Sequence, residues 1–285
     1  MNDKPEHLSW EEAVVWLRNQ PERQQLVIDG YYDDPVMAAA ERYRQSSEWQ
    51  EIAQLLQGRA GMALDIGAGR GIASFALAKE GFEVTALEPD PSAIVGAGAI
   101  RSLANEAGLA IRVAEEFSER LPFADGTFDV VHARAVLHHM SDLDIACSEM
   151  FRVLRPGGLL IAVREHVISR ERDLNAFLAA HPLHHLYGGE YAYRLDCYVR
   201  ALKAAGFDRL QVLPPLKSPI NLLPYTINSL REAVLDKVAQ KIPGRPLWRM
   251  MLGSDRVFRS LLSVAERFDH RPGRLYSFVA HKAAS

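Results

Sequence analysis

A glycine-rich segment, residues 64–71 (LDIGAGRG), has the composition of a ligand-binding turn. It follows a short apolar run and precedes a helical pattern, so its glycines would lie between a strand and a helix. Such a turn lets the backbone approach a ligand closely, and the helix N-terminus offers unpaired N–H groups to an anion. A dinucleotide fingerprint needs a third glycine in G-x-G-x-x-G, but Ile72 stands at that place when counted from Gly67. The spacing therefore disfavours NAD.

An acidic residue, Glu88, comes at the end of the next strand-like run, residues 83–87, and Pro89 ends that run. A carboxylate at this place can accept two hydrogen bonds from the hydroxyls of a ribose. We therefore expect Glu88 to belong to the same ligand site as the glycine-rich segment.

Several histidines could supply a general base. His138 and His139 follow the strand-like run 128–133, and His166 follows the run 159–163. In open α/β sheets, ligands gather at the carboxyl ends of the strands, which is where these histidines would lie. A helix cap or a structural role is an equal alternative for each of them.

The segment 181–191 (HPLHHLYGGEY) is rich in histidine and tyrosine and contains a fourth candidate base, His184. We expect a hydrogen-bonding pocket for a substrate here, with one histidine as base; a capped loop is the alternative. A divalent-metal site is a further alternative for this segment, but no HExxH or similar ligand spacing supports it, so no residue is assigned as a metal ligand.

Four segments in order, LDIGAGRG, VTALEPDP, ERLPFADGTFDVV and RVLRPGGLL, resemble the class I S-adenosylmethionine-dependent methyltransferases, in particular the small-molecule group of methyltransferase type 11. The resemblance covers about residues 60–163. It implies an enzyme that uses S-adenosyl-L-methionine as methyl donor and releases S-adenosyl-L-homocysteine.

The resemblance also implies which residues bind the donor. The glycine-rich segment would hold the methionine part, Glu88 the ribose, and Glu116 the adenine amino group with Phe117 stacked on the ring. Phe117 stands where an Asp is common in the family, which leaves the register there open. The implied donor-binding residues are Asp65, Gly67, Ala68, Gly69, Gly71, Glu88, Pro89, Asp90, Glu116, Phe117, Ala133 and Arg134.

The acceptor of the methyl group is less defined than the donor. The sulfonium is already an activated electrophile, so the protein mainly has to position the reactants and exclude water. A base is needed only for a hydroxyl or an acidic carbon. We expect O-methylation of a sugar or secondary-metabolite hydroxyl; the alternatives are C- or N-methylation, or a non-catalytic donor-binding scaffold.

The order of strand-like and helical patterns around these residues predicts an α/β fold. Regular alternation of apolar runs and helical patterns is typical of a Rossmann-like, doubly wound sheet with helices on both faces. We expect seven mostly parallel strands, at residues 60–66, 83–87, 110–113, 128–133, 159–163, 210–213 and 275–281. The helices between them are expected at 72–79, 94–107, 143–154 and 196–205.

The same pattern predicts that the chain is divided into three parts. Residues 1–57 form an N-terminal helical segment, in which Ser9 and Glu12 make a capping box. Residues 58–213 and 274–285 form the donor-binding core. Residues 214–273 form a helical insertion, with helices at 228–241 and 246–268, as a lid over the acceptor site or a dimer element.

Composition limits the partners. The 285 residues are 48% hydrophobic and 24% charged with a net charge of −3, so no polyanionic partner is implied, and N-P-P-[FY] is absent after residue 133. No run approaches the roughly 20 apolar residues of a membrane span, and the first ten residues do not look like a signal peptide. We expect a cytoplasmic protein that binds a small-molecule acceptor, with a homodimer as an open alternative.

Overall fold

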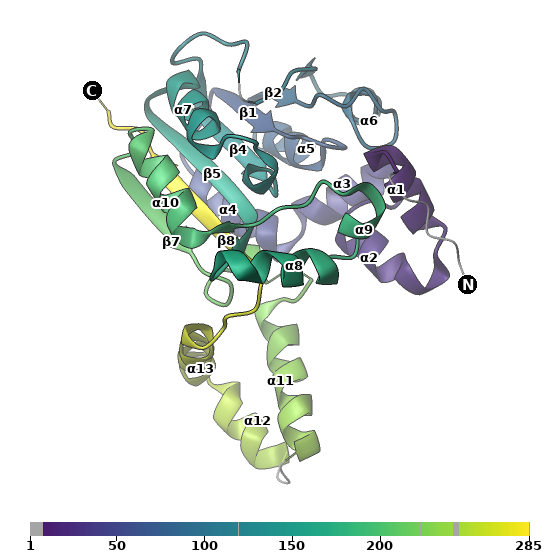
Figure 1. The fold of residues 1–285 in the computed structure, drawn as a ribbon, viewed down its shortest axis with the longest axis vertical. Helices are drawn as coiled ribbons and strands as arrows, with labels where there is room; N and C mark the ends of the chain where they lie inside the picture. The colour runs from purple at the N-terminus through teal and green to yellow at the C-terminus, as the bar shows by residue number, and fades with distance from the viewer. Residues whose placement is uncertain (1–7, 119, 223, 242–244, 285) are drawn as a thin grey trace.

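The computed structural model describes residues 8–118, 120–222, 224–241 and 245–284, in which one mixed β-sheet carries helices on both faces (Figure 1). The strands lie in the order β3-β2-β1-β4-β5-β8-β7. Strands β1 to β5 are parallel, and β8 is antiparallel to both β5 and β7. The predicted Rossmann-like, mostly parallel sheet is thus confirmed. The strands are β1 Met62–Ile66, β2 Glu83–Leu87, β3 Ile111–Ala114, β4 Phe128–Arg134, β5 Leu154–Ile168, β6 Tyr193–Arg194, β7 Arg209–Leu213 and β8 Arg274–His281.

Two apolar cores lie on opposite faces of the sheet. Successive residues of β1 point to opposite faces, so Ala63 joins one core and Leu64 the other. On the first face pack α3 Val36–Arg44, α4 Ser47–Leu56, α5 Ile72–Lys79 and part of α6 Ala97–Ala107. On the second face pack α7 Leu143–Val153 and α10 Leu195–Ala204. The central strands are therefore covered on both sides, as their apolar runs predict.

Some element bounds differ from the prediction for local reasons. Strand β5 continues to Ile168, well past the predicted end at residue 163, because its second half pairs with β8 and with the short strand β6. Helix α6 begins at Ala97 rather than residue 94, since the Ser92 hydroxyl accepts hydrogen bonds from the backbone N–H groups of Ile94 and Val95 in a turn.

The N-terminal segment contains α1 Trp10–Arg18, the 3-10 turn η1 Pro21–Arg23 and α2 Gln24–Asp29 before α3 and α4. The predicted capping box is confirmed: the Ser9 hydroxyl accepts from the Glu12 N–H, and the Glu12 carboxylate accepts from the Ser9 N–H. Helix α2 was not predicted. Residues 1–7 of the segment, 119 and 223, 242–244 of the insertion and 285 lie outside the described residues.

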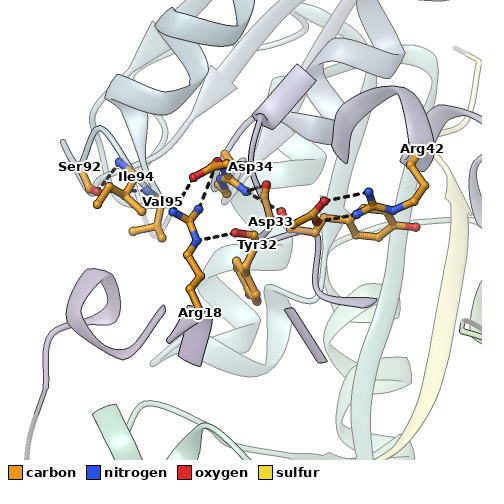
Figure 2. A network of polar contacts seen from close by, with 10 residues as sticks. Arg18, Tyr32, Asp33, Asp34, Arg42, Ser92, Ile94 and Val95 are labelled. Carbon is orange, nitrogen blue, oxygen red and sulfur yellow. Dashed lines mark hydrogen bonds and ion pairs between the residues drawn. The ribbon is translucent and has the colours of Figure 1, made fainter. Parts of the chain in front are cut away.

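A network of arginine and aspartate side chains ties this segment to the glycine-rich turn (Figure 2). Arg18 of α1 pairs with Asp34 at 2.7 Å, and Arg42 of α3 pairs with Asp33 at 2.6 Å. Arg70, in the glycine-rich turn, also pairs with Asp34 and donates to the carbonyl oxygen of Tyr31 at 2.9 Å. The helices before residue 57 are therefore held against the turn.

The three helices of the insertion lie apart from the sheet, below it in Figure 1, whereas its first turn packs on the core through Ile220. The insertion contains the turn η4 Pro219–Asn221, then α11 Ile227–Lys241, α12 Arg245–Gly253 and α13 Asp255–Arg267. The predicted single helix 246–268 is interrupted at Ser254, which lies between α12 and α13. The buried apolar side chains of α11, α12 and α13 form a cluster separate from the cores of the sheet: Leu235, Leu252, Phe258 and Leu262. None of the helices in the described part of the chain has the length and apolar character that a membrane crossing would require.

A buried carboxylate joins α4 to strands β4 and β5. Glu48 is fully buried; it accepts from Arg134 Nε at 2.6 Å and lies 3.7 Å from Arg164 Nη1. Burial would raise the pKa of Glu48, but the two guanidinium groups outweigh burial and lower it. The hydroxyl of Tyr43 also donates to this carboxylate at 3.2 Å. Glu48 is thus an ion-pair partner of both arginines.

We expect the substitution Glu48→Gln to lower the free energy of unfolding by about 3–5 kcal/mol, because it removes the buried charge that pairs with Arg134 at 2.6 Å. Urea denaturation followed by circular dichroism measures the change. The control is Glu51→Gln, a partly exposed carboxylate on the same helix, which should change stability by less than about 0.5 kcal/mol. Equal losses in the two variants would contradict the role given to Glu48.

Candidate active site

The glycine-rich turn connects β1 to α5. Gly67, Gly69 and Gly71 have φ values of 61°, 53° and 81°. A Cβ atom at Gly67 would lie 2.6 Å from Cγ2 of Val136, in the loop after β4. Gly67 is therefore required both by its left-handed backbone and by the close approach of the neighbouring loop.

Glu88 bridges the turn after β1 and the loop after β2. Its Oε2 accepts from the N–H of Gly69 at 2.7 Å, and its Oε1 accepts from the N–H of Asp90 at 3.0 Å. Burial raises the pKa of Glu88 to about 7; the charges of Asp90 and Asp65 also raise it, and the two N–H donors lower it. Each carboxylate oxygen keeps further acceptor capacity for a ligand.

Asp65, in β1 just before the turn, contacts side chains of α5 and β4. Its Oδ2 accepts from the Ser74 hydroxyl at 2.6 Å, and its Oδ1 lies 2.8 Å from Nδ1 of His132. Asp65 is buried and belongs to the lining of the cavity described below, and both of its carboxylate oxygens contact protein partners. We infer that Asp65 holds the start of α5 against β4.

The other residues implied for the donor divide into two groups. Ala68, Pro89 and Arg134 line the same cavity as Gly67, Gly69 and Glu88. Five others are absent from the described lining of that cavity: Gly71, Asp90, Glu116, Phe117 and Ala133. Phe117 is 71% exposed and Glu116 is exposed too, so neither covers an adenine ring in this arrangement; their roles remain predictions.

A cavity of about 530 Å³ runs from Glu88 to the predicted histidines. Part of its wall comes from the N-terminal segment through Trp10 and Leu26, and part from Leu183 and Tyr187 near α9 His184–Tyr187. None of the described lining residues comes from residues 214–273. In this arrangement the helices of the insertion pack on one another, and residues of α1, α2 and α9 line the cavity. A role of the insertion as a lid or dimer element stays a prediction.

His138 is buried within the 3-10 turn η2 Leu137–His139, after β4. Its Nδ1 lies 2.7 Å from Oε2 of Glu165, and its Nε2 lies 3.6 Å from Oε2 of Glu190. Burial alone would lower the pKa of His138, but these two carboxylates raise it to about 9. Glu165, in β5, also accepts from the backbone N–H groups of residues 136, 137 and 138.

His139, His166 and His181 lie around the same place. Nδ1 of His139 is 2.9 Å from the carbonyl oxygen of Gly189, and Nδ1 of His166 is 2.9 Å from that of Gly273. Burial lowers the pKa of His139 and of His181, and lowers that of His166 to about 3. The structure therefore brings three of the predicted bases, His138, His139 and His166, to one end of the cavity.

His184 does not join them. It begins the short helix α9, beside His185, and is absent from the described lining of the cavity. Glu165 is the functional candidate that the sequence interpretation missed. The signal was its place next to His166 in β5, because a charged residue that continues an apolar strand needs a buried partner.

Comparison with known proteins adds a family likeness for the core. Residues 64–162 match the family model described as a methyltransferase domain. Ubiquinone biosynthesis O-methyltransferase of Agrobacterium fabrum is 30% identical over 149 residues, which are 51% of this chain and 58% of that protein. O-methyltransferase resE of Aspergillus sclerotiorum is 33% identical over 135 residues, or 46% of this chain and 50% of that protein. The chain thus spans about half the length of these relatives.

Solved structures agree on the fold. Phosphoethanolamine N-methyltransferase 2 of Haemonchus contortus, in complex with S-adenosyl-L-methionine, has a TM-score of 0.53 at 20% identity and covers 91% of this chain and 59% of that chain. The cyclase SpnF has a TM-score of 0.53 at 21% identity and covers 87% and 82%. Likeness at these identities concerns the fold, which by itself does not determine the reaction.

We expect Gly67→Ala to weaken binding of S-adenosylhomocysteine at least about tenfold, because the added Cβ meets Val136 and the φ of 61° disfavours alanine. Isothermal titration calorimetry measures the affinity. Gly58→Ala is the matched control, since Gly58 has a φ of +77° but nothing within 4 Å of its Cβ position. Both variants carry the backbone cost, so equal affinities would exclude the proposed contact as the cause.

Binding of S-adenosylhomocysteine should also depend on pH through Glu88. A ribose donates hydrogen bonds to the carboxylate form, and the pKa of the free carboxyl is about 7. Below pH 7 the Glu88 carboxyl is mostly protonated, and it must lose this proton when the ligand binds. We therefore expect the affinity for S-adenosylhomocysteine to be about tenfold weaker at pH 6 than at pH 8. Glu88→Gln cannot titrate and should bind weakly with little pH dependence. A wild-type profile as flat as that of the variant would overturn the assignment.

Proposed function

Because residues 64–162 make this chain a class I S-adenosylmethionine-dependent methyltransferase of the type 11 group, we propose that it transfers a methyl group from this donor to a small molecule in the cavity. The observation that carries the proposal is that Glu88 and His139 line one cavity. Transfer requires the donor and the acceptor in line, in contact and away from bulk water. A shared cavity meets that requirement.

S-adenosylmethionine is the methyl donor of this family, and the turn after β1 fits it. The buried Glu88 carboxylate has oxygens with acceptor capacity for two ribose hydroxyls. Gly67 and Gly69 leave backbone exposed to the cavity, where the methionine part would lie next to the N-terminus of α5. The donor supplies an activated methyl group, so the residues around it have to bind and orient rather than activate.

For the acceptor we propose a hydroxyl oxygen at the histidine end of the cavity. The Gly189 carbonyl can only accept, so Nδ1 of neutral His139 carries the proton and Nε2 keeps a lone pair. Glu190 offers a second acceptor, Oε2, 3.9 Å from that nitrogen. Either atom could take a hydrogen bond from the hydroxyl that is methylated. The O-methyltransferase names of two curated relatives support this choice.

Phenols, hydroquinones and sugars are the acceptor classes to test first, because each presents a hydroxyl on a small frame. A nucleic-acid acceptor is not proposed, since the net charge is −3. The cytoplasmic location and the homodimer remain predictions.

The experiment begins with calorimetric binding of S-adenosylmethionine and S-adenosylhomocysteine. A panel of hydroxylated acceptors is then incubated with trideuteromethyl donor, and mass spectrometry and NMR identify the product and the methylated atom. Binding without any oxygen-methylated product would overturn the hydroxyl assignment. No binding of either compound by folded protein would overturn the transfer reaction itself.

In the same assay we expect His139→Gln to slow methyl transfer by about a hundredfold or more, because the lone pair that receives the hydroxyl proton is lost. The affinity for S-adenosylhomocysteine should stay within about twofold, since His139 lies at the other end of the cavity from Glu88. The control is His185→Gln, an exposed histidine of α9 whose Nε2 contacts the carbonyl oxygen of Ala179. Unchanged transfer in His139→Gln would remove that residue from the reaction.

A further inference from the structure

Five side chains from distant parts of the chain converge at the histidine end of the cavity. We call His138, His139, His166, His181 and Glu190 the His–Glu cluster. Ligand atoms of His138, His139 and Glu190 lie within 4.8 Å of one another, and so do those of His166, His181 and Glu190. Glu190 belongs to both sets and is only 8% exposed. The cluster therefore centres on one buried carboxylate.

The spacing of these atoms does not suit hydrogen bonds. Oε2 of Glu190 is 3.6 Å from Nε2 of His138 and 3.9 Å from Nε2 of His139, beyond the range of a hydrogen bond. This buried oxygen has no hydrogen-bond partner among the described residues. A buried acceptor without a partner costs free energy, so the arrangement calls for a further group at this point.

The same spacing is close to that of atoms bound to one cation. Metal–ligand distances of about 2.0–2.1 Å in a tetrahedral site place neighbouring ligand atoms about 3.3 Å apart. The two separations from Oε2 of Glu190, 3.6 Å to His138 and 3.9 Å to His139, exceed that value by about 0.3 and 0.6 Å, and all three ligand atoms lie within 4.8 Å of one another. Movement of this size is within the reach of side chains that border a cavity.

The outer contacts of the cluster orient its ligand atoms. Nδ1 of His138 lies 2.7 Å from the Glu165 carboxylate, and Nδ1 of His139 lies 2.9 Å from the Gly189 carbonyl oxygen. A proton on each Nδ1 leaves each Nε2 with its lone pair toward Glu190. The other oxygen of Glu190, Oε1, accepts from the Tyr187 hydroxyl. Metal-bound histidines and carboxylates are typically held by outer hydrogen bonds of this kind.

We propose that His138, His139 and Glu190 form a binding site for a divalent cation of the zinc class. Two imidazole nitrogens and one carboxylate oxygen are a donor set that Zn²⁺ accepts, with a fourth position left open. The side chain of His139 is 37% exposed and borders the cavity, so the open position faces the space where an acceptor would bind. Binding of the cation does not depend on methyl transfer. In the metal-bound form the lone pair on Nε2 of His139 is used in coordination, so an acceptor hydroxyl would bind at the open position of the cation instead of donating to His139.

The competing explanation is an ion-pair network in which a protonated His138 lies between Glu165 and Glu190. That network would need no metal and would bind none stoichiometrically. The two explanations therefore differ in a measurement that does not involve the methyl-transfer reaction.

The test uses the full chain without an affinity tag, treated with a chelator and dialysed against Zn²⁺. Elemental analysis should give about one zinc per chain, and Co²⁺ in its place should give the visible absorption of a four-coordinate site. Glu190→Gln and His139→Gln should lose the bound metal, while His185→Gln should retain it. Circular dichroism and binding of S-adenosylhomocysteine establish that each variant is folded with its donor site intact.

Three results would overturn the proposal. Wild-type protein that binds no stoichiometric zinc would favour the ion-pair network, and full zinc retention in Glu190→Gln would show that the metal binds elsewhere. His181→Gln separates the two ligand sets: retention of zinc supports the assigned set, whereas loss in this variant together with retention in His139→Gln would overturn it in favour of the other set.

Discussion

The buried carboxylate of Glu48 is the interaction on which the arrangement of the cavity depends. It neutralises Arg134 at the end of β4 and lies close to Arg164 within β5, so it compensates two guanidinium groups at the centre of the sheet. The ring of Tyr43 lies 5.3 Å from the Arg134 guanidinium, which adds a cation–π contact. Because Glu48 belongs to α4, the N-terminal segment supplies the buried carboxylate that pairs with these two arginines of the core sheet.

The same segment is joined to the donor end of the cavity. Arg70 follows Gly69 in the turn after β1, and its guanidinium donates to the backbone carbonyl oxygens of residues 31 and 33. The turn is thus fixed from inside the core by Asp65 and Glu88, and from outside by the loop before α3. A prediction that treats residues 1–57 as a separate helical unit describes the chain order correctly but misses this dependence.

A feature of the structure can be predicted from the sequence when the residues that form it are close together along the chain. The turn after β1 and Glu88 are encoded within short runs, because the strand, the glycines and the helix start are contiguous, and these were predicted. Strand β5 is different: Glu165 and His166 interrupt its apolar pattern, and only partners some thirty and a hundred residues away satisfy them. The His–Glu cluster combines residues 138 and 139 with residue 190, so no local ligand spacing exists to be recognised. The position of the insertion likewise depends on packing that periodicity does not specify.

Helices α1 and α9, which line the cavity, link its donor end to its histidine end. Trp10 of α1 packs edge-on against Tyr187 of α9 with ring centroids 4.7 Å apart, and the Leu8 N–H donates to the Leu186 carbonyl oxygen at 2.9 Å. The Tyr187 hydroxyl in turn donates to Glu190, the carboxylate at the centre of the His–Glu cluster. A displacement of α1 would therefore alter the position of Glu190 as well as the cover over the donor end. Since α9 has only four residues and little stability of its own, its position must come from these contacts with the N-terminal segment. The segment that precedes the methyltransferase core in sequence is in this way a structural part of both halves of the candidate site.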